Sequence, residues 1–158
     1  MSRLRSLDLL IATLWVGSLW TVGYLVAPTL FATLADRALA GTIAASVFRI
    51  EAWLSLGCAA ALLALSLLRG KPADVPDKRP GKRFSAVWLV VAMAACTLIG
   101  YFGLQPFMAA IRVGAAGREM TGDARLYFGL LHGVASVIYL VQSLLGGVLI
   151  LKLRGHSV

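Results

Sequence analysis

Two ionisable side chains, Glu51 and His132, stand inside or beside long uncharged stretches of the sequence. Tyr24 and Gln105 occupy comparable places in the other two stretches. Counted at 1.5 Å per helical residue from the nearest basic residue at the opposite end of its own stretch, each of the four lies about 27–33 Å away. Arg49 falls at nearly the same height. The spacing therefore predicts one polar layer near the outer boundary of a membrane.

A carboxylate and an imidazole in one layer, with Ser136 a helical turn beyond His132, could bind a metal ion, relay a proton or hold a polar ligand. Ionisable residues in a membrane segment are functional candidates by default. The alternative interpretation is structural: Glu51 pairs with Arg49 or Arg112, and His132 hydrogen-bonds a neighbouring helix. The layer is not predicted to be a catalytic site.

A second group lies at mid-depth and contains soft ligands. Cys58 and Cys96, with Met93 and Met108, could attract an ion such as Cu(I). Free cysteine is also a small, commonly buried apolar residue, and this interpretation is favoured. The sequence requires no cofactor, and copper or haem remains a weaker possibility.

The elements that must position these residues follow from composition. The chain has 158 residues, 59% of them hydrophobic and 14% charged, against about 25% charged in a soluble domain. A soluble enzyme and a disordered chain are excluded. The uncharged runs are long enough to span a bilayer and do not alternate as barrel strands do. The prediction is an all-α polytopic membrane protein: one four-helix bundle domain, 1–158, with helices over 7–34, 41–68, 84–111 and 125–152.

Basic residues predict the orientation of the bundle. Ten of the 15 Lys and Arg residues lie at the two termini and in the linker 69–83, and the other five lie on the opposite side. The positive-inside rule then places both termini and the linker in the cytoplasm. The linker could contact anionic lipid, although a topology signal alone is the favoured reading. Nucleic acid is not an expected partner, because no folded module accompanies these charges.

Small and weakly polar residues follow one side of each predicted helix and indicate close helix packing, within the chain or in a homo-oligomer. The clearest stripe runs along the last helix and comprises Gly129, His132, Ser136, Tyr139, Ser143 and Gly147.

Pro28 and Pro106 lie near the outer ends of the first and third helices. Each is expected to end or kink its helix, and a simple helix terminus is the favoured interpretation.

Several short motifs occur in a characteristic order along the chain. They are Trp15-Val16-Gly17, Ala27-Pro28 with Phe31, Ala40-Gly41 with Phe48, and Phe128 with Leu131-His132-Gly133 and Ser136. In this order the chain resembles a bacterial membrane-protein family of unknown function related to eukaryotic transmembrane protein 205. The resemblance implies a four-helix fold in the bacterial inner membrane and no known reaction. It directs attention to Trp15, Gly17, Pro28, Phe48, His132 and Ser136.

The architecture is more distantly similar to copper resistance D-like membrane proteins and to histidine-bearing, haem-linked membrane oxidases. Those proteins typically carry more than one intramembrane histidine, whereas this chain has only His132. Three functions stay open: a non-enzymatic protein whose outer layer binds a small ligand or ion, a redox subunit binding haem or quinone, and an assembly factor acting by packing alone. No P-loop or HExxH motif is present, and nothing argues for an enzyme.

Overall fold

The computed structural model describes residues 2–68, 81–114 and 121–154, and side chains over 6–68, 86–114 and 121–154. Every secondary-structure element in the described part of the chain is a helix, and four helices are long and apolar enough to cross a membrane. The predicted all-α, four-span architecture is confirmed. The spans are Ser6–Thr33, Arg37–Leu68, Ala86–Gly114 and Gly122–Arg154. Most of the basic linker 69–83 lies outside the described residues, as does His156.

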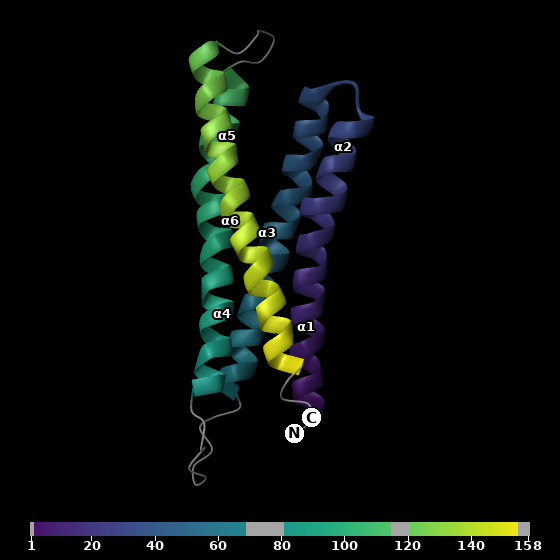
Figure 1. The fold of residues 1–158 in the computed structure, drawn as a ribbon, viewed down its shortest axis with the longest axis vertical. Helices are drawn as coiled ribbons and strands as arrows, with labels where there is room; N and C mark the ends of the chain where they lie inside the picture. Colours follow the sequence, from purple (N-terminus) through teal and green to yellow (C-terminus); the bar gives the residue numbers. More distant parts are fainter. Residues whose placement is uncertain (1, 69–80, 115–120, 155–158) are drawn as a thin grey trace.

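The four spans are built from eight helical elements. The first contains α1 (Ser2–Trp20), the π-helical η1 (Thr21–Val26) and α2 (Ala27–Thr33). The second is α3 (Arg37–Leu68). The third contains α4 (Gly81–Thr97), the π-helical η2 (Leu98–Leu104) and α5 (Gln105–Gly114). The fourth is α6 (Gly122–Arg154). α1 begins and α6 ends at the same end of the bundle (Figure 1); we call the other end distal.

The second span starts at Arg37, earlier than the uncharged run suggests, because Asp36 caps it. The Asp36 Oδ1 atom accepts hydrogen bonds from the backbone N–H groups of Ala38, at 2.8 Å, and Leu39, at 3.1 Å. Such a cap satisfies donors that have no partner inside the helix. The chain therefore turns tightly from α2 into α3, which lies beside it.

The two membrane prolines do not end their helices, contrary to the expectation from sequence. Pro28 is the second residue of α2 and Pro106 the second residue of α5, and both helices continue beyond them. Each proline is preceded by a π-helical segment, η1 or η2. A wider helical turn accommodates a residue that lacks an N–H group and whose ring would collide with the preceding turn.

The apolar core lies in the half of the bundle nearer the termini. Trp15 and Met93 are fully buried there, and small residues allow the helices to approach. A Cβ added at Gly146 of α6 would lie 2.8 Å from Val16 Cγ2 and 3.3 Å from Met93 Cε. The core cluster consists of Ala12, Trp15, Val16, Cys58, Ala59, Leu62, Val90, Met93 and Leu149.

In the distal half the four spans separate into two pairs. α2 packs beside α3, and α5 packs beside α6, with a gap between the pairs in the ribbon (Figure 1). α2 has no buried residue, and the buried residues of α6 begin only at Gln142. The distal half of α6 therefore lies outside the packed core.

Candidate functional site

A polar face runs along α6 from its distal end into the core. Arg125, His132, Ser136, Tyr139 and Ser143 recur at helical spacing, so they share one side of the helix. The two residues nearest the core are engaged by the first span. The Tyr139 hydroxyl donates to the Leu19 carbonyl at 2.6 Å, and the Tyr24 hydroxyl donates to Ser143 Oγ at 3.0 Å. The face is thus directed toward the opposite pair of helices.

His132 and Ser136 lie on the same face but beyond these contacts, and both are exposed. The His132 ring stacks on Phe128, with ring centroids 6.2 Å apart and planes 3° from parallel. The Ser136 hydroxyl donates to the His132 carbonyl at 2.8 Å. The structural interpretation expected His132 to hydrogen-bond a neighbouring helix. The His132 ring instead stacks on Phe128 within α6.

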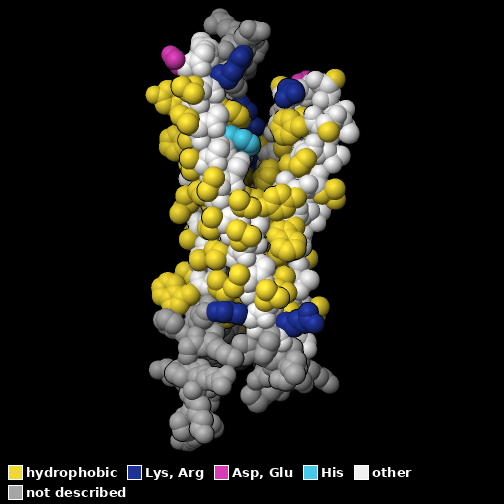
Figure 2. Space-filling model, in the orientation of Figure 1, with side chains coloured by type: hydrophobic (Ala, Val, Ile, Leu, Met, Phe, Trp, Pro, Cys, Tyr) yellow, Lys and Arg dark blue, Asp and Glu magenta, His cyan; other side chains and the backbone are white. Residues whose placement is uncertain are grey.

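The space faced by these residues is a hollow between the two pairs of helices, and Figure 2 shows it at the distal end of the molecule. We call it the distal cleft. Its α3 side carries Arg37, Gly41 and Phe48, which share a helical face. The two sides approach at two places. The Phe48 and Tyr139 rings lie 5.5 Å apart, and Arg112 of α5 donates to the Gly41 carbonyl at 3.2 Å.

Aromatic rings form the floor of the distal cleft. Tyr139 meets the edge or face of both Phe48 and Tyr24, with ring centroids 5.5 and 6.2 Å apart. Both pairs are close to perpendicular, which is a favoured geometry for aromatic contacts. Gly23 makes this approach possible, because an added Cβ there would overlap the Tyr139 ring. Tyr139 also lies within electrostatic range of Glu51.

Glu51 is buried below this floor, with 5% of its surface exposed. Its carboxylate accepts a hydrogen bond from the Ser55 hydroxyl at 3.1 Å, while the nearby Ser18 hydroxyl donates to the Trp15 carbonyl at 2.9 Å. Ser55 in turn accepts from the Trp15 indole N–H at 2.8 Å. Arg112 instead binds the Gly41 carbonyl, and Arg49 is exposed. A hydroxyl group, rather than the arginines considered from sequence, therefore holds the carboxylate.

The structure brings together part of the predicted polar layer. Tyr24 contacts Tyr139, and Glu51 is buried one helical turn from Phe48, the other ring that contacts Tyr139. His132 and Ser136 lie on the cleft face of α6, and Gln105 is half-buried at the start of α5.

Two residues of the soft-ligand group, Cys58 and Met93, lie in the apolar core, and the other two do not. Cys58 and Met93 belong to the core cluster, Cys96 is half-buried, and Met108 is buried in α5. Both cysteines are free thiols. Across the described residues, no three His, Cys, Asp or Glu side chains gather in a way that could hold a metal ion.

Sequence reasoning missed a second buried polar pair. Gln142 Nε2 of α6 donates to Thr97 Oγ1 of α4 at 2.9 Å, and Thr97 donates to the Met93 carbonyl at 3.3 Å. The sequence signal for this pair was the amide side chain of Gln142 in the middle of a predicted spanning helix. This pair connects α4 and α6 and lies with the packed half of the bundle, so it is assigned to packing.

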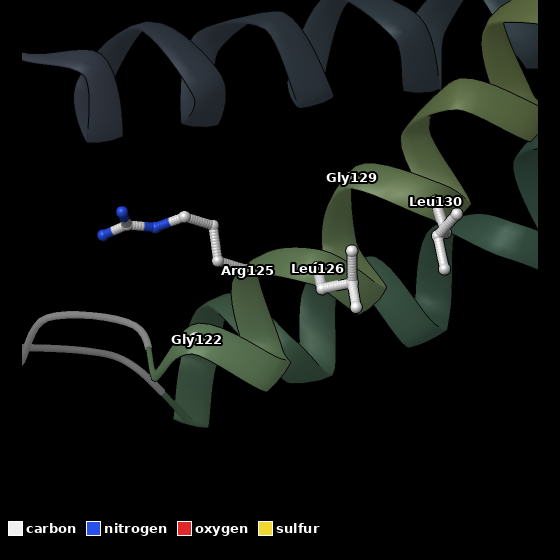
Figure 3. A pocket seen from close by; sticks show the side chains of 5 residues that line it. All are labelled: Gly122, Arg125, Leu126, Gly129 and Leu130. Carbon is white, nitrogen blue, oxygen red and sulfur yellow. The ribbon is translucent and has the colours of Figure 1, made fainter.

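One shallow pocket lies at the distal end of α6. It has a volume of about 450 Å³ and is lined by Gly122, Arg125, Leu126, Gly129 and Leu130. Arg125 extends away from the helix into the open space beside it (Figure 3). The pocket therefore combines one cation with two leucines.

The residues singled out by the resemblance have different surroundings. Trp15 is fully buried in the core, and Phe48 lies at the cleft floor. Gly17 makes no close approach, since a Cβ added there would meet nothing within 4 Å. Gly23 and Gly146 are the tight positions of their helices.

Fold and composition together define a multi-pass helical membrane protein of unknown function. Residues 10–116 match the family described as Domain of unknown function (DUF4149), and the chain belongs to that family. The match ends before α6, so the polar face of that helix lies outside it. No curated protein and no solved structure matches the chain.

Proposed function

We propose that this is a non-enzymatic protein of the bacterial inner membrane, with both termini cytoplasmic, whose distal cleft holds a small polar ligand. The observation that carries this proposal is the polar face of α6. It continues outward past its last protein contact and lines an open hollow with His132 and Ser136. Under the proposed orientation the cleft opens toward the outer side.

Membrane energetics support this reading. A polar side chain in a membrane segment is costly unless it meets protein, water or a ligand. Tyr139 and Ser143 meet protein partners. His132 and Ser136 are exposed instead, in a part of α6 that has no buried residue. The Ser136 hydroxyl donates to the His132 carbonyl, so the His132 ring is the group that needs an outside partner. Water or a polar ligand in the cleft satisfies its ring nitrogens, whereas acyl chains cannot.

Packing alone is the second candidate, and the buried network favours it for the lower residues. Glu51, Ser55 and Trp15 form a chain of hydrogen bonds within the bundle. These linked hydrogen bonds fix the position of α1 relative to α3 without any ligand. Under this alternative the exposed residues of the α6 face have no role.

The two candidates are separated by blocking the cleft. Ser136→Trp places an indole in the distal cleft, and Val137→Trp is the matched control, since Val137 is 61% exposed and lies about 100° further around the helix. Each protein is purified in mild detergent, and its solvent extract is compared with wild type by mass spectrometry. We expect a molecule that is retained by wild type and the control but lost from Ser136→Trp. Identical extracts from all three would refute ligand binding and leave packing.

A further inference from the structure

Three arginines from three helices surround the mouth of the distal cleft. Arg112 reaches across it to the Gly41 carbonyl of α3. Arg37 shares the α3 face of Gly41 and Phe48, and Arg125 shares the α6 face of His132. Figure 2 shows basic side chains on both sides of the hollow at its distal end. Positive charge therefore converges on the entrance.

Among the described residues, the nearby carboxylates do not account for this convergence. Asp36 is engaged at the start of α3, where it accepts two backbone hydrogen bonds. Glu51 is buried below the aromatic floor and accepts a hydrogen bond from Ser55. Asp123 lies in the first turn of α6, where a carboxylate complements the helix terminus. An anion entering the cleft would meet guanidinium groups first.

Phosphate is the anion that this donor set fits best. Guanidinium groups bind phosphate oxygens through paired, charge-assisted hydrogen bonds, and they are the side chains most suited to that geometry. Donors on α3, α5 and α6 surround a tetrahedral group from more than one side. A planar carboxylate can be bound by a single guanidinium group, so it does not require donors from three helices.

The surroundings of the arginines indicate that the phosphate belongs to a lipid. Leu126 and Leu130 line the same pocket as Arg125. On the opposite pair of helices, Phe31 lies beside Gly41, since a Cβ added at Gly41 would be 4.0 Å from Phe31 Cζ, and Phe31 is 44% exposed. An amphiphile can place its phosphate among the arginines and its acyl chains outside the cleft, along the apolar flank of α6 that Leu126 and Leu130 form, whereas free phosphate makes no use of these leucines.

We infer that the distal cleft binds the phosphate headgroup of an anionic membrane lipid, with Arg37, Arg112 and Arg125 as its ligands. This inference rests on the proposed ligand-binding function, and it identifies the polar group that the cleft holds as a lipid headgroup.

The test uses delipidated full-length protein titrated with phosphatidylglycerol and followed by native mass spectrometry. Arg112→Gln and Arg125→Gln are compared with Arg49→Gln. Arg49 is exposed on α3 and lies about 100° from the cleft residue Phe48. Because a charge-assisted hydrogen bond is lost, we expect each cleft variant to bind about tenfold more weakly or worse, while the control binds as wild type.

Folding is controlled by helical circular dichroism and by Arg125→Lys, which keeps the charge and should recover part of the affinity. Equal lipid binding by all variants would overturn the inference. So would displacement of the lipid by inorganic phosphate at comparable concentration, because the ligand would then be the free anion. If phosphatidylglycerol fails to bind while Ser136→Trp still loses a retained molecule, the lipid inference fails and the ligand-binding function stands.

Discussion

The packed half of the bundle depends on a close helix approach at Gly146, and this can be tested by adding one methyl group. A Cβ at Gly146 would lie 2.8 Å from Val16 Cγ2 and 3.3 Å from Met93 Cε. Val16 and Met93 are 1% and 0% exposed, so neither side chain can move easily into free space. Gly147 is the internal control, because a Cβ there would meet Trp20 Cζ2 at an ordinary 3.9 Å.

The expected magnitudes follow from two opposing effects. Replacing a helical glycine by alanine stabilises a helix by about 0.5–1 kcal/mol. Inserting a methyl group into a filled core costs about 1–3 kcal/mol. Gly147→Ala should stabilise the helix without overpacking the core. Gly146→Ala should therefore be less stable than Gly147→Ala by about 1–3 kcal/mol.

The assay is equilibrium unfolding in mixed micelles, followed by tryptophan fluorescence, with wild type and both variants measured side by side. Trp15 is buried in the core and reports its opening. If Gly146→Ala proves as stable as Gly147→Ala, α6 does not approach α1 and α4 as described, and the argument for the core fails.

Three further predictions use the same reasoning. Trp15→Phe removes the indole donor to Ser55 and should lower the free energy of unfolding by about 1 kcal/mol or more. Trp53→Phe is the control and should change this free energy little, because Trp53 is 62% exposed. Equal effects of the two substitutions in a micelle unfolding assay would refute the buried network. Tyr139→Phe keeps the ring contacts but removes the hydrogen bond to the Leu19 carbonyl. The loss should reduce the free energy of unfolding by about 1 kcal/mol and so lower the midpoint of thermal unfolding. An unchanged midpoint would show that this hydrogen bond contributes nothing to stability. A topology reporter inserted between α5 and α6 should read periplasmic, and a cytoplasmic reading would invert the proposed orientation.

The spans were predictable from sequence because lipid imposes a length and a composition on any helix that crosses it. The uncharged run from Leu126 to Leu151 is long enough to cross a bilayer and therefore predicts a spanning helix, and the structure has α6 there. The stripe on that helix was visible too, since Tyr139 and Ser143 do contact the first span.

The separation of the helix pairs was not predictable, because it depends on where tight contacts stop. The same periodic stripe continues from Ser143 to His132, and only the three-dimensional packing distinguishes the packed part from the exposed part. The π-helical segments were also missed, since a proline such as Pro28 signals a disturbed helix but not the way the chain absorbs it. The partners of Glu51 were missed for a similar reason. The charge of Glu51 suggested an arginine partner, whereas the Ser55 hydroxyl donates the hydrogen bond.

The central claim is that the distal cleft is open to water from the outer side, and thiol labelling measures this directly. Ser136→Cys and Val137→Cys are compared in a Cys58→Ala, Cys96→Ala background, using intact cells and a membrane-impermeant maleimide. The reactive thiolate forms in water and not among acyl chains. Labelling at position 136 should therefore be at least about tenfold faster than at position 137. Equal rates, or no labelling at position 136, would contradict the cleft.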